Sequence, residues 1–148
     1  MVTFHELTED DVEAVSIIES ETFSMPWKAA DFLEMINLDY AYYIVAKENG
    51  VPIGCCGVRN MCGDGEITNV VIQKNHRRKG YARQMLKYLM ENARHRGVRR
   101  YTLEVRRSNE AAIALYEELG FKCEGIRPNF YEKPVEDALI YWLDFPID

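Results

Sequence analysis

The chain has 148 residues, of which 47% are hydrophobic, 11% aromatic and 28% charged. This composition lies near the globular average and excludes the disordered, collagen-like and transmembrane classes, and a chain of this length can bury roughly 70% of its unfolded surface. The first residues lack the basic region and apolar run of a signal peptide. We therefore expect a single cytoplasmic domain over residues 1–148 that contacts no membrane.

The four cysteines do not follow the spacing of a metal site. Cys55 and Cys56 are adjacent, Cys62 and Cys123 stand apart, and the three histidines are distant from them and from one another. Zinc sites use closely spaced Cys and His ligands, and a chain of this length does not need disulfides for stability. We expect no metal, and free thiols in a reducing compartment.

Charge is strongly segregated along the chain, although the net charge is only −6. Residues 74–107 contain 12 Lys and Arg against 2 Asp and Glu, a net of +10, whereas the other residues contain 6 basic and 22 acidic side chains, a net of −16. A basic segment can be a solvated surface or a nucleic-acid footprint. The acidic flanks, the pI near 5.2 and the lack of interleaved aromatic residues favour a compact polyanionic cofactor over nucleic acid.

Helix and strand patterns follow one another along the whole chain. Thr8 can cap a first helix, and apolar positions at helical spacing mark a longer helix that Gly97 ends. In chain order, we expect helices over 9–22 and 28–37, a hairpin of strands over 42–47 and 53–59, a turn at Gly63-Asp64-Gly65, a strand over 66–72, a helix over 81–96, a strand over 100–106, a helix capped by Ser108 or Asn109 and ended by Gly120, a strand over 121–126, a long polar connection, and a strand over 138–145. This order predicts an α/β (α+β) fold with a mixed, twisted sheet flanked by helices.

An anion site is predicted where the strand over 66–72 leads through a basic turn into the helix over 81–96. The first turn of a helix has unpaired N–H groups and the positive end of the helix dipole. Gly80 and Ala82 let a ligand approach the backbone closely, so a pyrophosphate would fit. An ordinary helix start with a glycine turn is the plainer alternative.

Residues 77–82, Arg-Arg-Lys-Gly-Tyr-Ala, resemble the acyl-CoA signature Q/R-x-x-G-x-G/A of the GNAT acetyltransferases. The run LEVRRSNEAAIALYEELGF over 103–121 resembles the second half of that fold in N-terminal acetyltransferases. Met25-Pro26-Trp27, Asn129-Phe130-Tyr131 and Glu136-Asp137-Ala138 are similar to segments of RimI-type ribosomal-protein alanine N-acetyltransferases. This resemblance covers nearly the whole chain and implies a GNAT fold.

The resemblance also implies the cosubstrate, acetyl-CoA, and the residues around it. Glu104 is the implied general base, and Tyr116 the implied acid that protonates the departing thiolate. The implied cofactor contacts are Val70, Val71 and Ile72 for the pantetheine arm, Arg78, Lys79, Gly80, Tyr81, Ala82 and Arg83 for the pyrophosphate, and Asn109 at the next helix start. The implied reaction is acetylation of a protein N-terminal α-amine, specifically the N-terminal alanine of a small-subunit ribosomal protein.

The chemistry is compatible with these roles but does not require them. A peptide α-amine with a pKa of about 7.8 costs roughly 3.5 kcal/mol less to deprotonate at neutral pH than a lysine at about 10.4, so a carboxylate base suffices. Glu104 could instead be a strand carboxylate paired with Arg106 or another nearby arginine. By its spacing, Tyr116 could equally be a core tyrosine.

The region from Arg127 to Ala138 is aromatic and acidic, and we interpret it as a substrate lip that includes Tyr131. A solvated hairpin with structural aromatic residues is the alternative. Two other functions stay open on the residues alone, namely acetylation of a different peptide, a lysine or a small amine, and a non-catalytic acyl-CoA-binding module. No nucleic-acid partner is expected.

Overall fold

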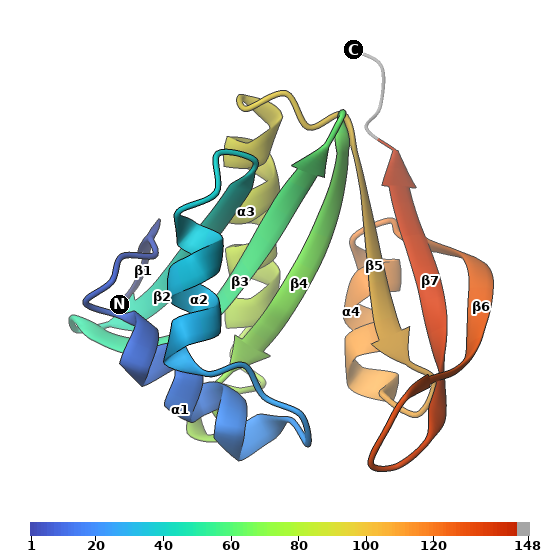
Figure 1. The fold of residues 1–148 in the computed structure, drawn as a ribbon, viewed down its shortest axis with the longest axis horizontal. Coiled ribbons are helices and arrows are strands. Elements are labelled where there is room, and N and C mark those ends of the chain that lie inside the picture. Colours follow the sequence, from blue (N-terminus) through green and yellow to red (C-terminus); the bar gives the residue numbers. More distant parts are fainter. Residues whose placement is uncertain (145–148) are drawn as a thin grey trace.

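The computed structural model describes residues 1–144 and contains a mixed sheet with helices on its faces (Figure 1). The elements are β1 (Val2–Glu6), α1 (Val12–Thr22), α2 (Ala29–Ile36), β2 (Ala41–Glu48), β3 (Val51–Met61), β4 (Asp64–Ile72), the 3-10 turn η1 (Lys74–His76), α3 (Tyr81–Arg94), β5 (Arg100–Arg106), α4 (Glu110–Glu118), β6 (Lys122–Tyr131) and β7 (Glu136–Asp144). The seven strands lie in the order β1-β2-β3-β4-β5-β7-β6, and the β4–β5 pair is parallel. The predicted fold class is therefore confirmed.

The alternation of side chains along β2 and β3 builds two hydrophobic clusters on opposite faces of the sheet. Tyr43 and Cys55 join the cluster under α1 and α2, whereas Ile44 and Cys56 join the larger cluster under α3 and α4. Because successive strand residues point to opposite faces and helices cover both faces, the central residues of both strands are buried. Within residues 1–144, no helix has the length and hydrophobicity that a membrane crossing requires.

The helix over 81–96 and the strand over 100–106 are confirmed as α3 and β5. The expected cap by Thr8 is wrong: Asp11 is the N-cap, and Thr8 instead forms a turn in which its carbonyl accepts from the Asp11 N–H at 3.0 Å. The first strand, β1, was not predicted, because its five residues show too short an alternation. Its Val2 and Phe4 pack against the larger cluster.

The C-terminal hairpin also differs from the expectation. The prediction of a long polar connection is wrong, because β6 continues to Tyr131 and only residues 132–135 separate it from β7. Pro128 is tolerated because β6 is an edge strand whose register shifts between Arg127 and Tyr131. The turn expected at residues 63–65 lies one residue earlier, since β4 begins at Asp64. Phe145, the end of the last expected strand, lies outside the described residues.

The strands β4 and β5, neighbours in the middle of the strand order, diverge after a short parallel contact at their first residues, which lies at the top of Figure 1. Their register covers only residues 64–66 against 100–102. Beyond that contact, β5 pairs with β7 along its whole length, and β4 pairs with β3 on its other side. In the described chain, the edge of β4 from Ile67 to Ile72 that faces β5 therefore has no strand partner.

One glycine of β3 is required by this packing. A Cβ atom at Gly57 would overlap the ring of Tyr43, which is 2% exposed. We expect Gly57→Ala to lower the free energy of unfolding by about 1–3 kcal/mol, because Tyr43 has no space to move into. Urea unfolding followed by circular dichroism measures this change.

Gly125→Ala is the matched control, because a Cβ at Gly125 would meet its nearest atom, in Ile140, at an ordinary 3.5 Å. We expect a change within about 0.5 kcal/mol for this variant. Equal unfolding midpoints for the two variants would contradict the assigned role of Gly57.

Candidate active site

The elements that contain most of the predicted site residues, β4, α3, β5 and α4, lie around the divergence of β4 and β5 (Figure 1). Val70, Val71 and Ile72 form the end of β4, and Glu104 lies on β5 across the opening. The basic segment 78–83 leads from β4 into α3, and Asn109 and Tyr116 belong to the start and the body of α4. Val70 and Tyr116, which are 46 positions apart in sequence, thus belong to elements on either side of the point where β4 and β5 separate.

The start of α3 is a backbone cradle. Gly80, its N-cap, has φ +78°, and Arg78 has φ +65°, so both residues adopt the left-handed conformation. The Gln84 N–H donates to the Gly80 carbonyl at 3.1 Å, so the N–H groups of residues 81–83 precede that bond. The first turn of α3 contains no acidic residue. This arrangement suits a phosphate-like anion.

Two side chains fix the cradle to the rest of the fold. The Arg77 Nε donates to the Ile72 carbonyl at 2.8 Å, and its Nη2 donates to the Thr22 hydroxyl at 3.1 Å. His76 Nε2 lies 3.1 Å from a carboxylate oxygen of Glu48. The sequence does not predict these contacts of Arg77 and His76. Within a run of basic residues, an arginine that hydrogen-bonds to the protein cannot be distinguished from a solvated one.

Helix α4 lies beside the cradle. Arg83 of α3 forms an ion pair with Glu118 of α4. Asn109 is the N-cap of α4, as expected for one of the two candidates, and its Oδ1 accepts from the Ala112 N–H at 3.2 Å. The amide nitrogen of Asn109 makes no hydrogen bond within the described residues, so it can donate to a ligand.

Glu104 is a partly buried carboxylate with one cationic neighbour. Its Oε2 lies 3.3 Å from Nε of Arg127 on β6, and the two side chains are 24% and 57% exposed. Burial raises the pKa of Glu104, Arg127 lowers it, and Glu66 raises it further. The alternative pairing with Arg106 is wrong, because Arg106 pairs with Glu136 at 3.1 Å. The interpretation of Glu104 as an ion-paired carboxylate is confirmed with Arg127 as its partner.

Tyr116 packs in the core and also has a free hydroxyl. It is 6% exposed, and its ring centroid lies 5.9 Å from that of Phe121. Burial raises the pKa of Tyr116, with smaller contributions from Cys56 and Tyr131. Among residues 1–144, the Tyr116 hydroxyl has no hydrogen-bond partner, so its proton is available to a bound group.

Tyr131 lies at the end of β6, close to Glu104. Burial raises the pKa of Tyr131 to about 12, and the nearby Glu104 carboxylate adds to this shift. The Arg106 guanidinium lies 4.5 Å from the centroid of the Tyr131 ring. The same guanidinium donates to the carbonyls of Glu132 and Pro134 at 2.8 and 3.0 Å. Arg106 therefore holds both Tyr131 and the turn that follows it.

Two acids of the expected substrate lip make internal hydrogen bonds. Glu136 accepts from the Ser108 N–H at 2.6 Å, and Asp137 accepts from the Asn129 N–H at 3.0 Å. Asp137 thereby stabilises the β6–β7 hairpin, and Glu136 connects this hairpin to the segment between β5 and α4. They are therefore less available to a cationic peptide than the carboxylates of a solvated loop would be.

The cysteines are not arranged as a metal or disulfide site. Cys55 and Cys56 are buried on opposite faces of the sheet, and burial raises the pKa of both thiols. Cys62 and Cys123 are exposed, and all four are free. In the part of the chain that the structure describes, no three His, Cys, Asp or Glu side chains are clustered to hold a metal ion.

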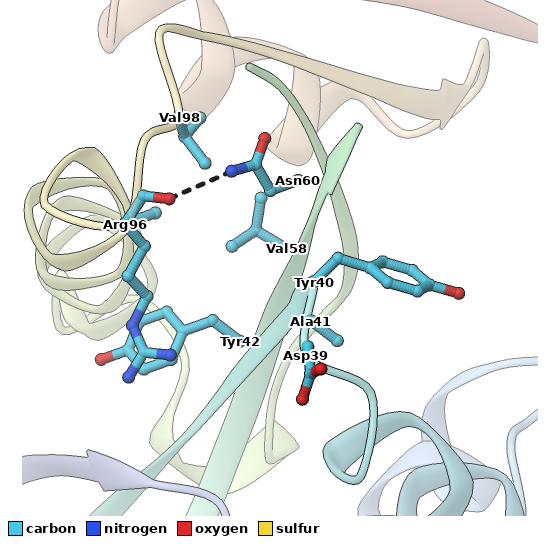
Figure 2. Close-up of a pocket in the computed structure, with 9 residues that line it drawn as sticks. Asp39, Tyr40, Ala41, Tyr42, Val58, Asn60, Arg96 and Val98 are labelled. Carbon is cyan, nitrogen blue, oxygen red and sulfur yellow. Dashed lines mark hydrogen bonds between the residues drawn. The ribbon is translucent and has the colours of Figure 1, made fainter. Parts of the chain in front are cut away.

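A small pocket of about 40 Å³ lies at the other end of α3, and none of the predicted site residues lines it (Figure 2). The Arg96 guanidinium lies 4.0 Å from the centroid of the Tyr42 ring, and the Arg96 carbonyl accepts from the Asn60 amide at 3.1 Å. These contacts join the end of α3 to β2 and β3. The pocket is thus part of a packing contact and is separate from the candidate active site.

The chain is similar to N-acetyltransferases of known sequence and structure. A Bacillus subtilis (strain 168) protein, to which ribosomal protein bS18-alanine N-acetyltransferase activity is assigned provisionally, is 35% identical over 90% of this chain and 89% of its own length. The ribosomal protein bS18-alanine N-acetyltransferase of Escherichia coli (strain K12) is 32% identical over 95% of each chain.

The crystal structure of the ribosomal-protein-S18-alanine N-acetyltransferase from Escherichia coli has the same fold, with a TM-score of 0.91 and 31% identity over 100% of this chain and 96% of that one. The profile of the acetyltransferase (GNAT) family matches residues 12–121. This range includes the cradle, the opening between β4 and β5, Glu104 and Tyr116. The chain belongs to the acetyltransferase (GNAT) family.

Proposed function

We propose that this protein transfers the acetyl group of acetyl-CoA to a protein N-terminal α-amine, and that the acceptor is the N-terminal alanine of ribosomal protein bS18. The Escherichia coli relative is named for this activity and matches the chain over nearly the full length of both proteins. We also propose that residues 1–148 act as one acetyltransferase domain. The observation that carries the proposal is a pair of groups on β5 and α4: the partly buried carboxylate of Glu104, and the hydroxyl of Tyr116, which has no hydrogen-bond partner within residues 1–144.

Acetyl-CoA supplies the acetyl group as an activated thioester. Its pyrophosphate is assigned to the backbone N–H groups of residues 78–83, because the left-handed Arg78 and Gly80 shape a cradle without acidic residues. Residues 70–72 at the open edge of β4 would hold the pantetheine arm, whose amide groups would pair with the backbone of that edge. A backbone N–H group of β4 would polarise the acetyl carbonyl, and the amide nitrogen of Asn109 would donate a hydrogen bond to the bound cosubstrate.

Glu104 and Tyr116 are assigned the proton transfers. Glu104 takes the proton of the attacking amine, and burial makes it a stronger base than an exposed carboxylate. Tyr116 donates its proton to the departing sulfur. Burial raises the pKa of the Tyr116 hydroxyl. Burial also raises the pKa of the thiol that leaves, so the difference in pKa between the Tyr116 donor and the thiolate acceptor stays small.

An N-terminal α-amine suits this site better than a lysine side chain. Deprotonation at neutral pH costs roughly 3.5 kcal/mol less for an α-amine than for a lysine amine. A single carboxylate base that also has a cationic neighbour is a modest base. Tyr131 is assigned to acceptor binding, because it adjoins Glu104 at the rim of the opening.

The acceptor is tested by thiol release from acetyl-CoA with a panel of amines. We expect turnover with a peptide that has the N-terminal sequence of bS18 and begins with alanine, and none with the same peptide blocked at its α-amine. Nα-acetyl-lysine, which offers only its side-chain amine, and a polyamine should be poor acceptors. Preference for a small amine would overturn the assigned acceptor, and tight acetyl-CoA binding without any turnover would favour a non-catalytic module.

The catalytic roles are tested by Glu104→Gln and Tyr116→Phe. We expect each variant to lower kcat by about 10²–10⁴-fold, since each removes one proton-transfer group. Acetyl-CoA affinity, measured by calorimetry, should stay close to that of the wild-type protein. Glu124→Gln and Tyr40→Phe, which change exposed side chains, are the matched controls. Unchanged turnover in either active-site variant would remove that residue from the mechanism.

The acid–base state of Glu104 depends on Arg127. Because Arg127 lowers the pKa of Glu104 against the raising effects of burial and Glu66, Arg127→Met should raise that pKa. The deprotonated base is then lost at a higher pH, so activity should fall first on the acidic side. Titration of the Glu104 carboxyl carbon by NMR, assigned with Glu104→Gln, measures the shift directly.

Arg107→Met provides the control for loss of a positive charge, because Arg107 pairs with Asp137 and not with Glu104. It should leave the Glu104 titration in place, and Arg127→Lys should restore most of the wild-type behaviour. A Glu104 pKa that does not change in Arg127→Met would show that the ion pair does not form in solution.

A further inference from the structure

Glu19 is a buried carboxylate that the proposed mechanism does not use. It lies on α1, is 2% exposed, and burial raises its pKa. Its Oε1 accepts from the Trp27 N–H at 3.1 Å and from the amide of Asn69 at 3.3 Å. Its Oε2 is buried without a hydrogen-bond partner in the described chain. Burying a carboxylate costs free energy, even with two hydrogen bonds. The burial of Glu19 therefore needs a structural reason.

Asn69 is the irregular residue of β4. Its φ of +59° is left-handed, and the β3–β4 register shifts next to it, between the pairs Gly57–Thr68 and Cys55–Val71. This bulge directly precedes residues 70–72, the open edge assigned to the pantetheine arm. The conformation of Asn69 therefore sets the direction of the N–H groups along that edge.

The side chain of Asn69 is held from both ends. Its Oδ1 accepts from the Tyr43 hydroxyl at 3.2 Å, and its Nδ2 donates to Glu19. The Tyr43 hydroxyl also lies 2.5 Å from the Thr68 hydroxyl. Gly57 leaves room for the Tyr43 ring, so the network is built into β2, β3 and β4.

Glu19 connects this bulge to the segment between α1 and α2. Its other donor, Trp27, stacks on Tyr43 at 6.0 Å between centroids and packs against Phe32 at 5.3 Å. Residues 23–26, just before Trp27, include the partly exposed Phe23 and Met25. The segment 23–27 and the β4 bulge therefore donate hydrogen bonds to the same oxygen, Oε1 of Glu19.

We propose that Glu19 is a positioning residue for acetyl transfer: through its hydrogen bonds to Asn69 and Trp27 it fixes the β4 bulge, and with it the N–H groups that face the acetyl carbonyl. This inference rests on the proposed function, since it assumes that the edge of β4 holds the acetyl donor. Glu19 itself does not touch the reacting atoms. Its effect should appear in the rate of transfer more than in cofactor binding, because the pyrophosphate cradle lies elsewhere.

The test compares Glu19→Met with Glu19→Gln. Methionine has a similar length but cannot accept hydrogen bonds well, whereas the Gln carbonyl can replace Oε1 toward both donors. We expect Glu19→Met to lower kcat at least about tenfold, because small displacements at a reaction centre are costly. The KM for acetyl-CoA should change less than about twofold, and Glu19→Gln should retain most of the activity.

The controls separate positioning from stability. Glu21→Met removes an exposed charge from the same helix and should not change kcat. All assays are made below the unfolding temperature of each variant, as checked by circular dichroism. If Glu19→Met only unfolds at a lower temperature and has wild-type kcat when folded, the positioning role is overturned.

A double-mutant cycle tests the route through Asn69. Asn69→Gly keeps the left-handed backbone but loses the side chain, so it should lower kcat by a similar factor. The double variant with Glu19→Met should be little worse than either single variant if both act on the same bulge. Fully multiplicative losses would contradict coupling through Asn69.

A second readout does not depend on any acceptor. The amide signals of residues 69–71 in ¹H–¹⁵N NMR spectra should shift in Glu19→Met and stay near their wild-type positions in Glu19→Gln. If the wild-type protein acetylates no peptide but these signals shift as expected, the proposed function fails and the structural part of the inference stands. If the signals do not shift in Glu19→Met, the inference fails whatever the substrate.

Discussion

The structure depends on the limited contact between β4 and β5. Parallel pairing over residues 64–66 and 100–102 joins the two halves of the sheet, and the strands then separate. At the joined end, a Cβ on Gly65 would lie 2.7–2.9 Å from Val98, Tyr101 and Val58, so only glycine allows this close approach. An unpaired strand edge is normally a liability, and here it is the edge that the proposed function assigns to the pantetheine arm.

Two carboxylates beside this opening are stabilised in different ways. Glu19 is almost fully buried and is held by neutral hydrogen-bond donors, whereas Glu104 is partly exposed and has the cationic Arg127 as its neighbour. Burial raises the pKa of both groups. Only Glu104 has an exposed cationic partner that can move away when an amine approaches, so the two environments favour a structural role for Glu19 and a chemical role for Glu104.

The sequence predicts the elements with strong local signals and misses those set by distant contacts. Helix α3 has a regular apolar face ended by Gly97, and α4 begins after the cap residue Asn109. Both helices are therefore predictable from local sequence. The strand β1 is too short for its alternation to be significant, and its pairing with β2 is what stabilises it.

The same distinction applies to the site. The resemblance named Glu104 and Tyr116, but local sequence could not choose Arg127 over Arg106 as the partner of Glu104, since that choice depends on how β6 and β7 are registered. Glu19 lies in a stretch that contains Glu21, and nothing local tells the buried acid from the exposed one. Burial of one of the two is decided by the packing of α1 on β3 and β4.

Helix α1 links the two parts of the proposed cofactor site. Glu19 and Thr22 are three residues apart and so lie on the same face of the helix. Glu19 accepts a hydrogen bond from Asn69 at the bulge. Thr22 accepts a hydrogen bond from Arg77, the residue that fixes the cradle to the fold. One helical turn thus spans from the strand assigned to the acetyl group to the segment assigned to the pyrophosphate. Because a helix is stiff over this distance, the spacing between the two cofactor contacts is set by α1, and a displacement of α1 would move both together.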